Sequence, residues 1–416
     1  MKWPSLNTQI LIGAVLGLAL GTGLGALEPG SSARETGLYA SGLVGGVFID
    51  LLKMVLVPLV FTSIVVGVAN LRAHHNINRV WVTTLVFSLL TTGIAIVVGL
   101  TAAHIFAPGK GLSLGMFHDA MQGFEATQLT LPEFFAKFLH GLFMNPVAAL
   151  AQGSVLAIVV FALFMGIALV AGGERYRNVL ALFQELFELT MLIVSWIMRL
   201  APLGIMALLA KLVATESSVL LGSLAKFVAV VFGTTVFHGI VVLPLILFLV
   251  VGMSPLRFWR GARPALLTAF ATSSSSATMP VTMRCLEQEL QVSPSITGFV
   301  VPLGAHLNMD GTALYEAAAA LFVANLAGID LNLGQQLVVC FTAMLASIGA
   351  PGIPSAGMVT MIMVLQSVGL PAEAVAILLP LDRPLDTIRT MVNVQGDMVS
   401  SLVVQKFSGE PAGRLQ

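Results

Sequence analysis

The chain has 416 residues, of which 57% are hydrophobic and only 10% are charged, and its formal net charge is zero. A soluble globular domain carries about 25% charged residues, so this composition indicates an integral membrane protein with several spans of about 20 apolar residues. The balanced charge offers no basic surface for nucleic acid. The two cysteines, Cys285 and Cys340, have neither the spacing of a metal site nor that of a disulfide framework.

The first 252 residues contain six apolar segments, which fall at about 8–27, 41–70, 80–107, 129–172, 179–214 and 217–252. The first lacks a convincing small-residue cleavage site, so we interpret it as a span and not as a cleaved signal peptide. The fourth is too long for one straight span, and Asn145-Pro146 and Gly153 indicate a broken helix there.

Lysine and arginine gather in alternate joints between these segments, including the joints around Arg72, Arg175 and Arg260. The joints between them, such as 28–40 and 108–128, carry acids and few bases. By the positive-inside rule we expect a multi-pass protein whose N-terminus and C-terminus are both cytoplasmic. A bacterial inner membrane is the predicted location, since no Asn-x-Ser/Thr sequon occurs.

After residue 264 short apolar pieces alternate with small polar runs at 272–276, 308–312 and 346–355. Neither the serine run nor the Gly/Pro run can be the middle of a regular spanning helix, and irregular backbone at membrane depth must be buried in protein or line a wet cavity. Two interrupted segments in comparable positions point to the binding site of a transporter. We therefore expect two re-entrant hairpins whose tips meet near the midplane of the membrane.

The segment from Pro380 to Asp397 carries a dense polar stripe. At about 100° per residue its polar members fall within an arc of about 80 to 100° on one helix face; they are Asp382, Asp386, Arg389, Thr390, Asn393 and Asp397. Ionisable groups at membrane depth are costly, so they are usually paired and functional. The alternative is a self-neutralising cluster that only holds helices together.

Four further features can carry chemistry. The serine run offers hydroxyls and backbone N–H groups to a carboxylate, although it can also be a simple turn. The run 308–312 supplies oxygens that suit a hard cation such as sodium, or forms an ordinary Asn–Asp turn. Glu316 lies in an apolar helix and is a candidate proton carrier, the alternative being a neutral packing residue. The glycine-rich run 349–357 can form a gate over a substrate or a plain loop.

Together these runs resemble the glutamate/aspartate transporter family, the dicarboxylate/amino acid:cation symporters. The resemblance covers nearly the whole chain and includes Leu56–Phe61, Asn145-Pro146, Ser274–Ser276, Asn308–Thr312, Ala346–Gly349 and the pattern Asp386-x-x-Arg389-Thr390-x-x-Asn393-x-x-x-Asp397. It implies an all-α membrane protein with eight transmembrane helices plus two re-entrant helical hairpins. Such a protein would be an elevator-type transporter that assembles as a homotrimer in the lipid bilayer.

The resemblance also implies two domains. The scaffold would contain residues 1–78 and 108–215, which are spans one, two, four and five. The mobile transport domain would contain span three at 79–107 and residues 216–416. Within the latter we expect span six, hairpin 1 at about 256–291, span seven at about 294–328, hairpin 2 at about 331–366 and span eight at about 370–407.

For the substrate site, the resemblance implies that Arg389 clamps a side-chain carboxylate and that Asp386 holds an amino group. The other polar atoms of the substrate would be held by Ser274, Ser275, Ser276, Thr312, Ile353, Gly357, Thr390 and Asn393. The second arginine usual in the family is absent from its two known places, which are Ser273 and Thr387 here. Arg383 occurs instead, close to the stripe in angle, where it can neutralise Asp382 or Asp386.

The resemblance implies sodium as the coupling ion, with a proton as a second possibility through Glu316. One sodium site would use Asp397, Asn393, Asn308 and the carbonyl of Gly304, and a second would use Asp310, Thr91, Thr92 and Asn308. A third would use Ser347 and the backbone around Ala350. Ser88 and His306 replace the residues usual near these sites in the family.

The chemistry of the stripe restricts the substrate. Arg389 favours a distal carboxylate, whereas Asp386 beside it favours an amino group, and aspartate or glutamate satisfies both. We therefore predict a symporter, not an enzyme, that takes up acidic amino acids with sodium and/or protons; the alternative is a C4-dicarboxylate symporter (succinate or malate) of the same fold. A channel would instead pass current without accumulation. An intramembrane aspartyl protease would need a glycine where Val394 stands.

Overall fold

The computed structural model describes residues 6–69, 78–111, 140–152, 154–215, 218–350, 352 and 356–408. The described regular elements are all helical. Among the described residues five stretches are long and apolar enough to cross a membrane: Thr8–Gly25, Ser32–Val66, Arg79–Phe106, Ala157–Arg199 and Leu220–Val251. The protein is therefore a helical, multi-pass membrane protein.

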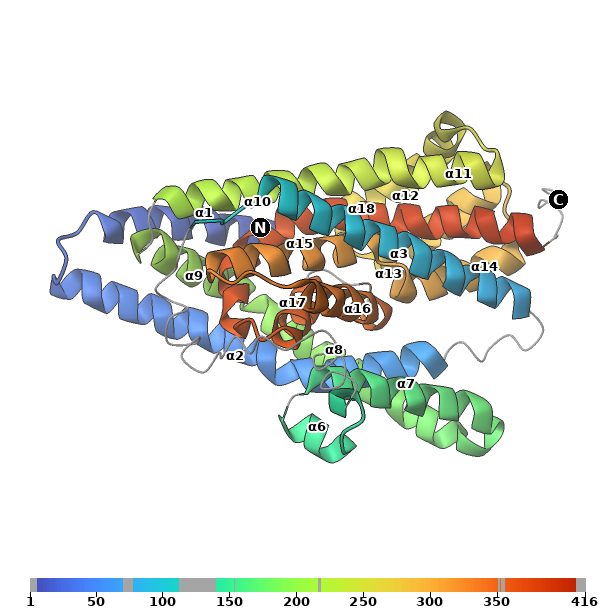
Figure 1. The fold of residues 1–416 in the computed structure, drawn as a ribbon, viewed down its shortest axis with the longest axis horizontal. Helices are drawn as coiled ribbons and strands as arrows, with labels where there is room; N and C mark the ends of the chain where they lie inside the picture. Colours follow the sequence, from blue (N-terminus) through green and yellow to red (C-terminus); the bar gives the residue numbers. More distant parts are fainter. Residues whose placement is uncertain are drawn as a thin grey trace, which may run out of the picture.

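One group of helices packs around the long helix α2. The group contains α1 (Leu6–Gly25), α2 (Ser32–Ala69), α6 (Pro146–Gln152), α7 (Val155–Gly172), η3 (Gly173–Tyr176), α8 (Arg177–Arg199) and α9 (Ala201–Thr215). Helix α2 contacts α7, α8 and α9, and α1 lies along α9 (Figure 1). The segment predicted at 179–214 is divided at Leu200, because Pro202 has no N–H for the helical ladder. Gly153, where a break was predicted, lies outside the described residues, between α6 and α7.

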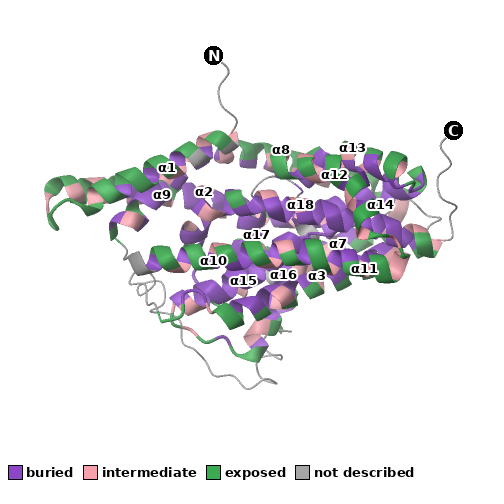
Figure 2. Cartoon of the chain, turned by 90° about the horizontal axis from the view of Figure 1, so that it is seen from above, coloured by how far each residue is buried: buried purple, intermediate pink, exposed green. Residues whose placement is uncertain are grey.

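A second group packs around α18. It contains α3 (Asn78–Phe106), α10 (Ser218–Phe237), the π-helix η4 (His238–Val242), α11 (Leu243–Val251), α12 (Pro255–Thr272), α13 (Ser275–Arg284), the π-helix η5 (Cys285–Glu289), α14 (Pro294–Leu307), α15 (Asp310–Leu326), α16 (Leu333–Gly349), α17 (Ala356–Ser367), η6 (Ala372–Ala374) and α18 (Val375–Ser408). Helix α18 runs through the middle of this group, contacts most of its other helices and is buried along most of its length (Figures 1 and 2). A polar stripe on such a helix must find its partners inside the protein.

Three breaks in the helices supply irregular backbone next to α18. Helices α12 and α13 fold back on each other at Ser273, whose φ of 51° is left-handed. Helices α16 and α17 form a second pair, and the turn between them includes Gly352. The third break separates α14 from α15 at Asn308 and Met309. Each break frees backbone groups that can bind polar partners.

Helices α16, α17 and α18 make the most extensive contacts between the two groups, against α2, α7 and α9. One polar contact joins them, since Nζ of Lys53 in α2 lies 2.6 Å from Oε1 of Glu373 in η6. Both side chains are partly exposed, so this ion pair adds little stability.

Helices α1 and α9 approach closely along a row of glycines. A Cβ atom at Gly13, Gly17 or Gly21 would lie 2.3, 2.6 or 2.8 Å from a backbone oxygen of α9. The four-residue spacing places the three glycines on one face of α1. Small residues at such spacing let two membrane helices pack backbone against backbone.

We expect Gly17→Leu to lower the midpoint of thermal unfolding in detergent, because the new side chain overlaps the α9 backbone and overpacking typically costs about 1–3 kcal/mol. Gly23→Leu is the matched control on the same helix, since a Cβ there meets nothing within 4 Å. The midpoints are measured by fluorescence-detected size exclusion after heating. Equal midpoints for the two variants would contradict the close α1–α9 contact.

Candidate functional site

A buried guanidinium lies at the centre of the polar stripe. Arg389 is 0% exposed, and its Nη2 donates to Oδ1 of Asp382 at 2.5 Å and to Oδ1 of Asp386 at 2.9 Å. Its Cζ lies 4.1 Å from the ring centroid of Tyr315 in α15, a cation–π contact. Nε and Nη1 have no hydrogen-bond partner among the described residues. Buried donors are normally satisfied, so the unpaired side of this guanidinium suits an anionic ligand.

The predicted substrate residues of α15, α17 and α18 gather around Arg389. A Cβ atom at Gly357 would lie 3.7 Å from Nη1 of Arg389 and 3.1 Å from Cγ2 of Thr312. Asn393 donates from Nδ2 to Oγ1 of Thr312 at 3.2 Å, and its Oδ1 accepts from the backbone N–H of Gly311 at 2.8 Å. Thr390 is buried next to Arg389 in the chain. Helix periodicity alone therefore predicted correctly that these α18 residues face inward.

The two helix pairs meet at their turns. The carbonyl oxygen of Gly352 accepts from Oγ of Ser274 at 2.7 Å and from the backbone N–H of Ser276 at 3.0 Å. Oγ of Ser274 also accepts from the N–H of Ala277 and so caps α13. Ser275 is buried at the same turn. The serine run thus holds the other turn directly; Ile353, predicted as a substrate contact, lies outside the described residues.

A second polar cluster surrounds Asp310 at the start of α15. Its Oδ1 accepts from Oγ1 of Thr92 at 2.8 Å and from Oγ1 of Thr91 at 3.2 Å. Oγ1 of Thr91 also lies 3.2 Å from Oδ1 of Asn308 and from two carbonyl oxygens of its own helix, so its one proton is shared among several oxygens. The structure brings together all four residues predicted for this cation site. Their oxygens are the donor type that a hard cation prefers.

His238 belongs to the same cluster and was missed by the sequence analysis. Its Nε2 lies 3.1 Å from Oδ2 of Asp310, and both side chains are fully buried. The π turn at His238–Val242 interrupts the α-helical spacing of the span at this histidine; such turns are frequent at functional sites. The available signal was an isolated histidine within the apolar segment 217–252, which is unusual at membrane depth.

A third group of oxygens surrounds Asp397. A Cβ atom at Gly304 would lie only 2.3 Å from Oδ1 of Asp397, and this oxygen has no partner among the described residues. Asn308 lies close by, since a Cβ atom at Gly396 would be 2.4 Å from its Nδ2. The carbonyl of Gly304 accepts from the backbone N–H of Asn308 at 2.8 Å. An unpaired buried carboxylate oxygen beside a carbonyl and an amide fits a sodium ion.

The third predicted ion site receives less support from the described side chains. Ser347 is buried, but its Oγ donates to the carbonyl of Met344 in its own helix at 2.8 Å. Ala350 is buried at the end of α16. These contacts are those of a helix end, so this site stays a prediction.

Glu316 lies fully buried in α15, one residue after Tyr315. Its Oε1 accepts a hydrogen bond from Oγ1 of Thr360 in α17, and its Oε2 has no partner among the described residues. Oγ1 of Thr360 also lies 3.2 Å from the carbonyl oxygen of Gly357, the residue that faces Arg389. The candidate proton carrier is therefore linked to the wall of the candidate substrate site.

A helical membrane bundle with broken helices around buried charges is the arrangement typical of the binding site of a secondary transporter. The sequence profile of the Sodium:dicarboxylate symporter family matches residues 6–407, and the chain belongs to this family. It is therefore a symporter and not an enzyme.

Among its relatives is "Excitatory amino acid transporter 3" of Homo sapiens, which is 36% identical over 451 residues that cover 97% of this chain and 86% of the relative. The mouse protein of the same name is 34% identical over 456 residues, with 97% and 86% covered. The "Proton/sodium-glutamate symport protein" of Geobacillus stearothermophilus is 33% identical over 413 residues, with 99% and 96% covered.

We expect Gly304→Ala to remove most of the stabilisation that sodium gives to the purified protein, because the added methyl displaces the Asp397 carboxylate. A ligand that binds only the folded state raises its unfolding temperature, so the sodium-dependent shift measures this site. Gly298→Ala in the same helix is the control, since its Cβ meets nothing within 4 Å. A sodium-dependent shift that survives in Gly304→Ala would show that Asp397 does not hold the ion.

Proposed function

We propose that the protein takes up acidic amino acids, aspartate or glutamate, by symport with sodium and/or protons. The observation that carries this proposal is the buried pair Arg389 and Asp386, in which two donors of the guanidinium have no partner in the described part of the chain and are available to a carboxylate. The names of the bacterial and mammalian relatives point to the same substrate class.

The two charges of this pair select the substrate together. Arg389 attracts the side-chain carboxylate of the substrate, and Asp386 accepts from its amino group. Succinate or malate would leave Asp386 facing another carboxylate, and like charges at close range are unfavourable. The C4-dicarboxylate symporter remains the second candidate, favoured by the family description. An uptake assay in which unlabelled succinate competes with labelled aspartate distinguishes the two candidate functions.

The coupling ions follow from the other clusters. The oxygens around Asp310 and Asp397 suit sodium, with Asn308 close to both. The third proposed ion site, at Ser347 and Ala350, has the least structural support of the three. Glu316 is the candidate that binds a proton, because an isolated carboxyl in an apolar helix is more readily neutral.

The proposed mechanism is elevator alternating access by a homotrimer. The group around α2 would be the scaffold, and the group around α18 would be the transport domain, which carries the site across the bilayer. This proposal comprises eight transmembrane helices and two re-entrant hairpins, formed by α12/α13 and α16/α17. Both termini would be cytoplasmic in a bacterial inner membrane. The packing of the helices into two groups supports the division into a scaffold and a transport domain.

We expect Arg389→Ala to weaken aspartate binding by at least about 30-fold, because it removes the buried partner of a carboxylate, a loss of about 2 kcal/mol or more. Neutral amino acids should bind at least as well as before. Arg284→Ala is the control, since this arginine on α13 is exposed and bonds to Gln288, away from the candidate substrate site. Aspartate uptake that is unchanged in Arg389→Ala would refute the proposed role.

We expect Glu316→Gln to abolish the response of aspartate uptake to an imposed proton gradient and to preserve its response to a sodium gradient. The amide resembles the protonated acid in shape but cannot titrate. The measurement is uptake of labelled aspartate into proteoliposomes with the two gradients imposed separately. If the variant responds to both gradients as the wild type does, another group carries the proton.

A further inference from the structure

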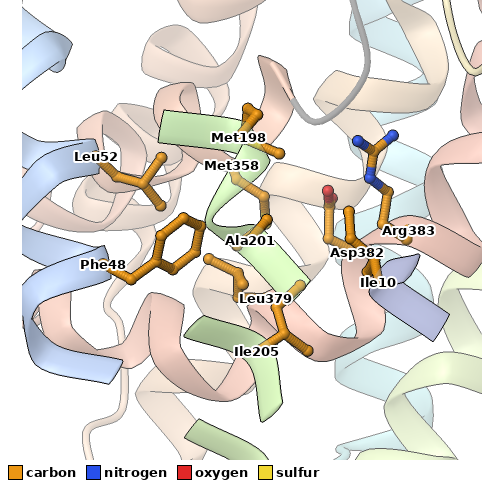
Figure 3. A pocket seen from close by; sticks show the side chains of 10 residues that line it. All are labelled: Ile10, Phe48, Leu52, Met198, Ala201, Ile205, Met358, Leu379, Asp382 and Arg383. Carbon is orange, nitrogen blue, oxygen red and sulfur yellow. The ribbon is translucent and has the colours of Figure 1, made fainter. Parts of the chain in front are cut away.

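Arg383 faces an apolar cavity where the two helix groups meet (Figure 3). The cavity is lined by apolar residues of α1, α2, α8, α9, α17 and α18, together with Asp382 and Arg383. It has room for about one water molecule, so an amino acid does not fit in it. In Figure 3 the side chains of Asp382 and Arg383 point to the same side of the cavity.

Both charged residues carry unpaired atoms. Arg383 is 8% exposed, and its Nε and Nη1 have no hydrogen-bond partner among the described residues. Oδ2 of Asp382 likewise has no partner there. The sequence analysis predicted that Arg383 neutralises an aspartate of the stripe, but Arg389 holds both aspartates instead. Two buried N–H groups of Arg383 without a partner among the described residues are unfavourable, so a carboxylate that can approach them is a favourable partner.

The geometry of Arg389 shows when Asp382 changes partner. A guanidinium grips a carboxylate with two parallel N–H bonds, and each of the two available edges includes Nη2. Nη2 of Arg389 already bonds to Asp382 and Asp386, while Nε and Nη1 belong to different edges. A substrate carboxylate that takes a two-bond grip must therefore displace one aspartate from Nη2. Asp386 can turn to the amino group of the substrate, which balances its charge. Asp382 meets no cationic group of the substrate and needs another partner once the substrate carboxylate competes for Nη2.

We propose that Arg383 is a positioning residue that takes over Asp382 when the side-chain carboxylate of an acidic amino acid binds to Arg389. This inference rests on the proposed function. The arriving carboxylate brings one more negative charge to a site in which one arginine already faces two aspartates. Transfer of Asp382 to Arg383 separates the Asp382 carboxylate from the substrate carboxylate, which would otherwise compete for Nη2. It also gives partners to the unpaired atoms of Asp382 and Arg383.

The local backbone favours this exchange. Pro380 and Pro384 bracket the two residues within α18 and supply no N–H to the helical ladder, so this turn has fewer hydrogen bonds than an ordinary turn. Asp382 and Arg383 are neighbours in the chain. A change of side-chain rotamers, with a small adjustment of one turn, can then bring their charged ends together.

The test is a double-mutant cycle on the purified full-length protein at saturating sodium, with aspartate affinity as the readout. We expect Arg383→Met to weaken aspartate binding by about tenfold or more, and Arg383→Lys to restore binding to within about threefold of wild type. In an Asp382→Asn background, Arg383→Met should change the affinity by less than about threefold. There the displaced side chain is neutral and needs no counter-charge.

The unfolding temperature in sodium without aspartate is measured for every variant, and it should shift little, because the inferred exchange occurs only with substrate. Arg383→Gln replaces Arg383→Met if the latter does not fold, with the same criteria. Wild-type affinity in the variant that is measured, or the same loss in the Asp382→Asn background, would overturn the role of Arg383. Failure of wild type itself to bind aspartate would instead refute the proposed function.

Discussion

The structure depends on the neutralisation of one guanidinium inside a membrane protein. Arg389 is completely buried, and its charge is stable there because two aspartates and the face of Tyr315 surround it. Taking such charges out of water is costly, so every group around them must be placed accurately. The same arrangement leaves two donors of Arg389 without a partner among the residues that the structure describes, and these donors can recognise an anion.

The broken helices follow from this constraint. Polar atoms can be presented at membrane depth only where backbone and side chains are sheltered by protein. The turn at Ser274 and Gly352 and the break at Asn308 bring such atoms against the polar face of α18. Gly304 shows how tight the packing is, because even a methyl group there would overlap Asp397. The clusters around Asp310 and Asp397 are thereby joined to the Arg389 site through a single helix and its neighbours.

Much of this arrangement could be predicted from the sequence, because the helical period of the polar residues and the composition of the serine run are visible without a structure. The helical period placed Asp386, Arg389 and Asn393 on one inward face, and the serine run marked a turn at Ser273. The partners of each charge could not be predicted in the same way. They depend on side-chain rotamers and on contacts between distant segments.

Two residues illustrate that limit. Arg383 was expected to neutralise an aspartate of the stripe, but it lines an apolar cavity while Arg389 binds both acids. His238 lies 72 residues before Asp310, and only the tertiary fold makes them neighbours. The division at Leu200 was also not foreseen, although Pro202 provided a local signal for it. Local sequence patterns therefore predict which helix face is buried and where a helix breaks. The partners of the charged side chains are known only from the folded structure.

The most direct test of the central claim is an experimental structure with aspartate bound in sodium. We expect the side-chain carboxylate of aspartate to lie within hydrogen-bond distance of the Arg389 guanidinium, and its amino group to lie at the same distance from Asp386. A bound aspartate that contacts neither residue, or that places its amino group toward Arg389, would contradict the proposed recognition of an acidic amino acid.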